Sequence, residues 1–305
     1  MKLALFVVLG VFGALYVLAL AAAVVRARRL GAQSGQQTVP TAFEVALGFV
    51  TCFFDTLGIG SFAPTTAALK LRNLVPDEKI PGTLNVGHTL ATVVQAYIFI
   101  AIVKVDLTTL VLMILAAVLG SWFGAGFVAR ASRRKIQIGM GLALLVAATL
   151  FISQIFKLTP AGGNTEGLAG WKLAAGFAGN FALGALMEVG VGLYGPCMIL
   201  VSLLGLNLKA AFPIMMGSCA FLMPVGSLKF IQSERYSLRT TIGLTLGGVP
   251  AVLLAAFIVK ELPLTAMRWL VVFVVLYAAL SMLRSAFVEG KAAAAAPAPV
   301  PSPLP

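Results

Sequence analysis

The chain has 305 residues, of which 60% are hydrophobic and 10% are charged, and its formal net charge is +12. A soluble domain has about a quarter of its residues charged, so this composition excludes a soluble globular protein. Long apolar runs, in place of short alternating strands, indicate a helical membrane protein. The basic residues lie in short loops beside apolar segments, which is typical of membrane orientation and argues against nucleic-acid binding.

The chain begins with an apolar stretch, residues 3–25, which is long enough to span a bilayer and is followed at once by Arg26, Arg28 and Arg29. A cleavable signal peptide is the alternative. Its apolar region would be shorter, and its charges would come before that region. We therefore expect an uncleaved transmembrane helix within residues 1–29, with a periplasmic N-terminus, followed by a polar linker at residues 30–41.

Two short apolar pieces come next, at residues 42–57 and 62–71. Each is short for a complete span, and the segment Gly58-Ile59-Gly60-Ser61 separates them. Pro64 suits the first turn of the second piece. The pattern predicts a broken helical hairpin that enters and leaves the membrane on one side.

The second half of the chain repeats this order. Sliding the sequence by 132 positions superimposes the glycine pair and the proline of the two breaks: Gly58, Gly60 and Pro64 fall on Gly190, Gly192 and Pro196. The first repeat is expected at residues 42–156, with full spans at 82–103, 107–129 and 136–156. After a connecting loop at 157–170, the second repeat is expected at 171–285, with a hairpin at 171–205, full spans at 211–231, 238–259 and 264–285, and a disordered Ala/Pro tail at 286–305.

The number of spans in each half determines how the halves are related. If each hairpin makes no net crossing, each half crosses three times, and the second half is inverted relative to the first. The C-terminus and the dense basic loop at 130–135 then both lie in the cytoplasm. The predicted fold is an all-α polytopic inverted repeat with a broken hairpin in each half. The same orientation follows if the hairpin helices cross the membrane fully.

Inverted repeats with broken helices near the midplane are typical of secondary transporters. The helix that follows each break directs free N–H groups and a positive dipole end toward the break, where a small anion can bind. The alternative is that the glycines only allow close helix packing. The candidate substrate-binding residues are Gly58, Gly60, Ser61, Thr65, Thr66, Asn85, His88, Gly190, Gly192, Tyr194, Gly195 and Ser218.

The span at 82–103 supplies two of these candidates. Asn85, His88, Thr89 and Thr92 lie on one face of this helix, as expected for a helix that lines a pathway. The alternative is that these side chains hydrogen-bond between helices.

Two carboxylates lie within apolar segments, Asp55 beside the first break and Glu188 beside the second. A charged side chain at the bilayer centre costs roughly 2.5–3.5 kcal/mol on insertion scales, so it normally faces a cavity or a partner. Both carboxylates are therefore candidates for binding a coupling proton. The alternatives are a pair with a cation such as Lys229, a position near the membrane surface, or a capping role. Lys229 itself is expected to extend toward the inner surface.

Enzymatic and metal-dependent functions are not expected. The sequence has no phosphate-binding loop, and His88 is the only histidine. Cys52, Cys197 and Cys219 lie in apolar segments without metal-ligand spacing, so they are expected to be core residues. No cofactor is predicted.

Two segments resemble a known family. The segment Phe54-Asp55-Thr56-Leu57-Gly58-Ile59-Gly60, followed by Ile80-Pro81-Gly82-Thr83-Leu84-Asn85, is similar to the TauE/SafE sulfite-exporter family of membrane permeases. The similarity extends over about residues 42–285. Family members usually have a glycine-richer first break, whereas Ser61 and Phe62 follow Gly60 here, and the second break has Leu193 and Tyr194.

This resemblance implies transport of sulfite, thiosulfate or an organosulfonate across a bacterial inner membrane. Together with the anion site expected from the helix ends, it predicts an exporter of a small sulfur anion, with proton linkage at the two carboxylates. An importer of another organic anion and a passive anion channel are the alternatives. The expected partners are the anion and the lipid bilayer, without nucleic acid, and the oligomeric state is left open.

Overall fold

The computed structural model describes residues 2–31, 37–158, 163–190 and 192–258, together with residues 269, 272–273, 276, 279–280 and 282–288. Within this part of the chain the structure is helical and contains no β-strand, which confirms the predicted all-α class. Most of the expected span at 264–285 and of the tail at 286–305 lies outside the described residues.

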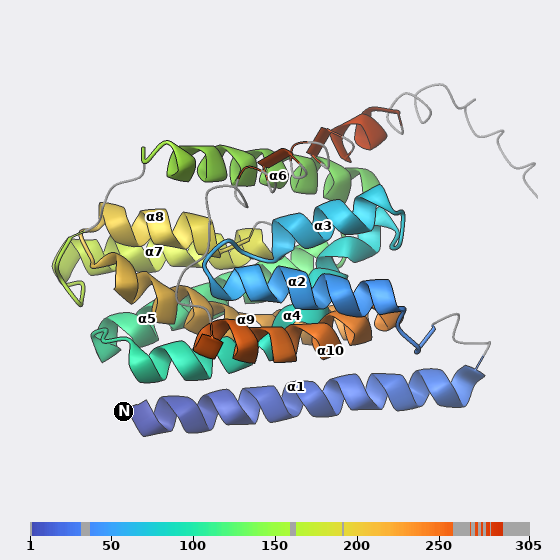
Figure 1. Ribbon diagram of the computed structural model, residues 1–305, viewed down its shortest axis with the longest axis horizontal. Helices are drawn as coiled ribbons and strands as arrows, with labels where there is room; N and C mark the ends of the chain where they lie inside the picture. The colour runs from blue at the N-terminus through green and yellow to red at the C-terminus, as the bar shows by residue number, and fades with distance from the viewer. Residues whose placement is uncertain are drawn as a thin grey trace, which may run out of the picture.

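The helices lie side by side along the long axis of the molecule (Figure 1). In chain order they are α1 (Lys2–Leu30), α2 (Ala42–Thr56), α3 (Phe62–Leu71), η2 (Asp77–Lys79), α4 (Ile80–Ile102), α5 (Leu107–Val128), α6 (Arg133–Ile155), α7 (Gly170–Met187), α8 (Tyr194–Leu203), η3 (Leu208–Ala210), α9 (Ala211–Gln232) and α10 (Leu238–Ile258).

Five stretches of the described chain are helical, long and apolar enough to cross a membrane: α1, η2 with α4, α5, α9 and α10. They confirm a multi-pass membrane protein. The expected span at 136–156 is helical as α6, but it is not one of these five.

Glycines interrupt the helices close to the predicted positions. Between α2 and α3, Gly58 and Gly60 have φ of 88° and 89°, and between α7 and α8, Gly190 has φ of 103°. Glycine reaches this left-handed region without the steric penalty that other residues meet, so each helix stops there and a new one begins. In Figure 1, α3 and α8 extend in opposite directions from the middle of the bundle.

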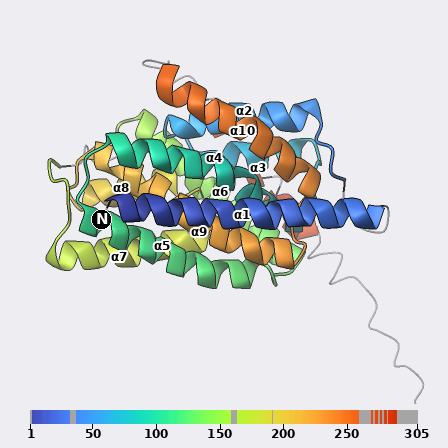
Figure 2. The same ribbon diagram turned by 90° about the horizontal axis from the view of Figure 1, so that it is seen from below.

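The first helix of each interrupted pair packs against a helix from the other half of the chain. A Cβ at Gly247 of α10 would lie 1.9 Å from the Val45 carbonyl oxygen of α2, and a Cβ at Gly120 of α5 would lie 1.9 Å from the Phe181 carbonyl oxygen of α7. Such backbone approach is typical of small residues at membrane helix interfaces. Figure 2 shows α2 with α10 at one edge of the bundle and α5 with α7 at the opposite edge.

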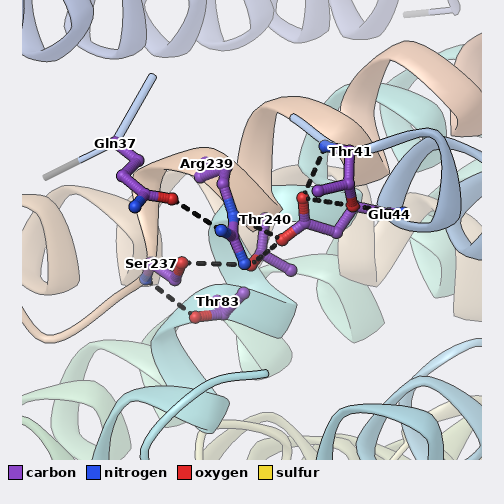
Figure 3. A network of polar contacts seen from close by, with 7 residues as sticks. All are labelled: Gln37, Thr41, Glu44, Thr83, Ser237, Arg239 and Thr240. Atoms are coloured by element: carbon purple, nitrogen blue, oxygen red, sulfur yellow. Dashed lines mark hydrogen bonds and ion pairs between the residues drawn. The ribbon is translucent and has the colours of Figure 1, made fainter. Parts of the chain in front are cut away.

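A buried polar cluster fixes the start of α2 to the start of α10 (Figure 3). Glu44 is fully buried and forms a capping box with Thr41, whose backbone N–H donates to Oε2 at 2.8 Å. On the other carboxylate oxygen, Arg239 Nε donates at 3.0 Å and the Thr240 hydroxyl at 2.7 Å. Gln37 accepts a further hydrogen bond from Arg239. The carboxylate is therefore satisfied from both helices.

The helices α4 and α9 form the centre of the bundle and are buried along most of their length. The polar residues of α4 are buried with them, and Thr89 lies 3.1 Å from Ser227 of α9. At the outside, α1 contacts α9 and α4, and the hydroxyl of its buried Tyr16 donates to the Val86 carbonyl. The most polar span thus lies at the centre of the protein, away from lipid.

Candidate functional site

The two helix breaks share one cavity. Residues from both breaks line it, with single side chains from α4 and α6 and two from α9. The lining residues are Asp55, Ile59, Gly60, Ser61, Phe62, Ala63, Thr92, Leu150, Met187, Gly192, Leu193, Tyr194, Gly195, Pro196, Cys219 and Met223.

The cavity is small. Its volume is about 40 Å³ when measured as the space open to the centres of water molecules. One water needs roughly 10–15 Å³ on this measure, so the cavity has room for about three waters. A compact oxyanion, with a few oxygen atoms around one central atom, is comparable in size.

Backbone N–H groups, rather than cationic side chains, are the donors that this cavity offers to an anion. Among its described lining residues there is no lysine, arginine or histidine, and Asp55 is the only carboxylate. The backbone N–H groups of Phe62 and Ala63 belong to the first turn of α3, so they have no acceptor within this helix. The same is true of the N–H groups of Tyr194 and Gly195 in the first turn of α8. Each helix start carries a positive dipole end of roughly half an elementary charge. Two such ends converge on the cavity.

Asp55 is almost fully buried at the end of α2, and a hydrogen bond holds its carboxylate in place. Gln95 of α4 donates from Nε2 to Asp55 Oδ2 at 2.8 Å and to the Thr56 hydroxyl oxygen at 2.9 Å. The amide oxygen of Gln95 accepts a hydrogen bond of 2.6 Å from the Tyr194 hydroxyl. One buried amide therefore connects the two breaks.

The sequence did not single out Gln95 as a site residue. Gln95 lies one helical turn beyond Thr92, so continuing the polar face of α4 by one turn would have included it. Its partners Asp55, Thr56 and Tyr194 are 40, 39 and 99 positions away in the chain. Contacts at such separations cannot be seen in the spacing of a single helix.

His88 and Thr65 lie behind the cavity wall and do not line it. His88 Nδ1 is 3.2 Å from Cys52 Sγ, and its Nε2 is 3.1 Å from the Thr65 hydroxyl oxygen. Both ring nitrogens are thus engaged by α2 and α3, the helices packed on this side of α4. The hydroxyl of the neighbouring Thr66 is buried without a hydrogen-bond partner.

Asn85 and Ser218 also lie outside the cavity. Asn85 donates to the Pro81 carbonyl oxygen of its own helix at 3.2 Å, and its amide oxygen is buried without a partner. Ser218 of α9 accepts a hydrogen bond of 2.9 Å from Asn180 of α7. Both therefore make contacts within or between helices.

The second carboxylate is not positioned like the first. Glu188 is fully buried at the end of α7 and accepts a hydrogen bond of 2.5 Å from Ser121, but it does not line the cavity. A Cβ at Gly226 would lie 2.5 Å from Glu188 Oε1, so glycine at this position leaves room for the carboxylate. Lys229 donates to the Trp122 carbonyl and lies 4.1 Å above the Trp122 ring. In the described structure no ion pair joins Lys229 to either carboxylate.

The glycines of the breaks also divide into two kinds. Gly60 and Gly192 line the cavity, whereas Gly58 and Gly190 face Phe212 and Met140 and shape the backbone. The predicted site residues at the cavity are Asp55, Gly60, Ser61, Gly192, Tyr194 and Gly195, and those away from it are Gly58, Thr65, Thr66, Asn85, His88, Glu188, Gly190 and Ser218.

Residues 2–151 match the family model described as Sulfite exporter TauE/SafE. Over this segment, which is just under half of the chain, the sequence is similar to the TauE/SafE family. The members of this family are membrane transporters and not enzymes. The matched segment includes α1, which the expected range of 42–285 left out, and it ends within α6, so it contains the first break but not the second. No curated protein and no solved structure matches the chain.

Proposed function

We propose that this protein is a secondary transporter that exports sulfite or a related sulfur oxyanion or organosulfonate and binds it in the cavity between the two breaks. The observation that carries this proposal is the convergence of the α3 and α8 starts on one cavity without cationic side chains. Backbone N–H groups at helix starts are well suited to anions. The TauE/SafE match supplies the sulfur chemistry.

The packing of the helices supports an inverted repeat built from residues 42–156 and 171–285. The contact of α2 with α10 corresponds to the contact of α7 with α5 when the two halves are exchanged, and α4 with α9 is the pair at the centre. Because each hairpin packs on the other half, we place the moving boundary between the α2–α10 pair and the α5–α7 pair. Rocking of one intact half against the other would break both close contacts.

Ion pairs support the proposed orientation. Arg26 with Glu234, Arg133 with Glu78 and Arg239 with Glu44 are formed at one end of the bundle, where α1 ends and α2, α6 and α10 begin. By the positive-inside rule, this basic end lies in the cytoplasm and the start of α1 in the periplasm of a bacterial inner membrane.

Asp55 is the proposed site of proton linkage. An ionised Asp55 repels an anion in the same small cavity, and protonation removes this repulsion. Substrate and proton then bind together. Glu188 is buried outside the cavity, so a proton on Glu188 would be carried without contact to the substrate.

Gly192 offers a direct test of the cavity. A Cβ at this position would have Phe62 Cβ as its nearest neighbour at 3.8 Å, and the backbone is outside the left-handed region, so alanine fits. A leucine would extend into the cavity. Gly60 is less suitable, since at φ of 89° any side chain also strains the backbone.

The experiment is thermal unfolding of purified wild-type, Gly192→Ala and Gly192→Leu protein with sulfite, thiosulfate, sulfate, sulfoacetate or acetate. A ligand that binds the folded state raises its apparent stability with concentration. We expect a sulfur anion to stabilise the wild type and Gly192→Ala but not Gly192→Leu. A response to acetate alone would discard the sulfur assignment, and equal stabilisation of all three proteins would overturn the cavity as the site.

A further inference from the structure

The amide of Gln95 lies between the proposed proton site and the proposed anion site. Its Nε2 donates to Asp55 Oδ2 at 2.8 Å, and its Oε1 accepts from the Tyr194 hydroxyl at 2.6 Å. All three side chains are buried, and Asp55 and Tyr194 both line the cavity. In this arrangement the only hydroxyl hydrogen of Tyr194 points to Gln95 and is withheld from the cavity.

We propose that Gln95 is a relay that makes Tyr194 an anion-binding donor when Asp55 takes up a proton. This inference rests on the proposed anion site and adds to it the residue that links proton and anion binding. Gln95 is therefore a positioning residue, which acts through Tyr194 and does not itself contact the anion.

The hydrogen-bond inventory of the three groups gives the mechanism. A proton arriving on Asp55 Oδ2 turns this oxygen from an acceptor into an O–H donor, which no longer fits against the Gln95 N–H group. Rotation of the amide by half a turn places Oε1 opposite Asp55 and Nε2 opposite Tyr194. The Tyr194 oxygen then accepts from Nε2, and its hydrogen rotates into the cavity. No covalent bond changes except the O–H bond formed on Asp55.

Thr56 holds the relay in its resting orientation. The Thr56 hydroxyl donates to the Cys52 carbonyl oxygen at 2.8 Å, so toward Gln95 it presents an acceptor, 2.9 Å from Nε2. An amide oxygen at that position would face another acceptor unless the Thr56 hydroxyl gave up Cys52. Both Thr56 and an ionised Asp55 thus favour the observed orientation, and protonation removes the contribution of Asp55.

Two cysteines and Tyr194 are the other titratable groups of the described chain that face Asp55. Cys52 of α2 and Cys219 of α9 interact electrostatically with Asp55, and the Tyr194 side chain of α8 also lies close enough to interact with this carboxylate directly. His88 of α4 lies beyond Cys52 and is engaged at both nitrogens. Among the described residues, Gln95 is the one that hydrogen-bonds both Asp55 and a donor of the second break.

The test measures how much the affinity for an anion changes with pH, and compares this change between the wild type and two variants. Thiosulfate and sulfate serve as probes because they remain dianions from about pH 5 to about pH 8, whereas sulfite titrates in this range. Affinity is measured by thermal stabilisation of the complete protein at both ends of this range. The variants are Gln95→Met, which keeps the side-chain length without hydrogen bonds, and Tyr194→Phe, which removes only the hydroxyl.

Charge repulsion alone predicts the same gain in affinity on acidification for all proteins. The relay predicts a gain that is roughly tenfold smaller in both variants. Tyr194→Phe lacks the hydrogen bond that the acidic state adds, whereas Gln95→Met leaves the Tyr194 hydroxyl without its acceptor, so this hydroxyl can reach the anion at either pH. At about pH 8 Gln95→Met should therefore bind the probe more tightly than the wild type. Gln137→Met is the matched control, because Gln137 is equally buried and donates to a different carboxylate, Asp77, at 2.9 Å. It should keep the full gain.

The outcomes separate the relay from the proposed function. Binding of thiosulfate or sulfate with an unchanged pH-dependent gain in Gln95→Met and Tyr194→Phe would overturn the relay and leave the anion site in place. Tyr194→Phe, which is the smaller change, decides the matter if Gln95→Met does not fold. If the wild type binds none of the sulfur anions, the proposed function fails and the relay fails with it.

Discussion

Arg239 Nε lies 3.0 Å from Glu44 Oε1, in a contact that joins the first turn of α10 to the first turn of α2. The Glu44 side chain is fully buried, so the guanidinium is the charge that balances it. Because α2 leads directly to the first break, this contact fixes the orientation of a helix whose far end lines the cavity. The stability of the pair is thus relevant to the geometry of the site.

Replacing Arg239 with leucine should lower stability, because it leaves a buried carboxylate with hydroxyl and backbone partners only. We expect a loss of about 3 kcal/mol in unfolding free energy, seen as a lower apparent melting temperature. Arg235→Leu is the control, since the one side-chain hydrogen bond of Arg235 to a described residue is a long contact of 3.5 Å to the Ala131 carbonyl oxygen. Equal losses in both variants would show that the Glu44 pair has no special role.

The approach of α10 to α2 should be sensitive to a single methyl group. A Cβ at Gly247 would lie 1.9 Å from the Val45 carbonyl oxygen and 2.7 Å from the Phe49 amide nitrogen, which are backbone atoms that cannot rotate away. Gly247→Ala is expected to cost about 1–3 kcal/mol of stability as the helices separate. Gly192→Ala, with its nearest neighbour at 3.8 Å, should unfold like the wild type. If Gly247→Ala is equally stable, the two helices are further apart than described.

A buried ion pair at the end of α3 gives a further prediction. Lys70 Nζ lies 2.7 Å from Asp77 Oδ2, with both side chains largely buried, and Gln137 donates to the same carboxylate. Lys70→Met should destabilise the protein by about 1–3 kcal/mol, because the buried carboxylate then keeps only the longer contact of 3.8 Å to Arg133 as its charge partner. Adding Asp77→Asn should restore much of the loss in a double-mutant cycle of thermal unfolding. Independent, additive losses would exclude a direct pair.

Asp55→Asn tests proton linkage. As pH falls, Asp55 gains a proton and loses the negative charge that repels an anion, so binding by the wild type should strengthen on acidification. The asparagine variant has no such charge at any pH, so we expect thiosulfate binding that is at least roughly tenfold tighter than wild type at about pH 8 and nearly independent of pH. The measurement is thermal stabilisation across pH. A pH dependence that persists in the variant would assign the coupling proton to another group.

Local patterns in the sequence were enough to predict the interruptions in the helices. The two pieces expected at 42–57 and 62–71 are α2 and α3, with ends within one residue of the prediction. The reason is that Gly58 and Gly60 occupy a backbone region that only glycine reaches without penalty, so a glycine in the sequence indicates where this conformation can occur. The breaks could thus be read from the chain itself.

The composition of the cavity was predicted only in part. Residues at the breaks, such as Ser61 and Tyr194, reach it because the backbone itself is there. The polar face of α4 was harder to interpret, because the direction of each side chain depends on which helix packs against it. His88 faces α2 and α3, whereas Gln95 connects both breaks. Such pairings are set by tertiary packing and leave no signal in helix periodicity.

The central claim is that one cavity, bounded by both breaks, carries a sulfur anion across the membrane. Counterflow tests it most directly: proteoliposomes are loaded with unlabelled thiosulfate or sulfite, and entry of the labelled anion is followed. A carrier should accumulate label transiently with the wild type and Gly192→Ala, and Gly192→Leu should show none. Equal counterflow with Gly192→Leu would contradict the cavity as the substrate site, and label that only equilibrates would indicate a passive channel in place of a transporter.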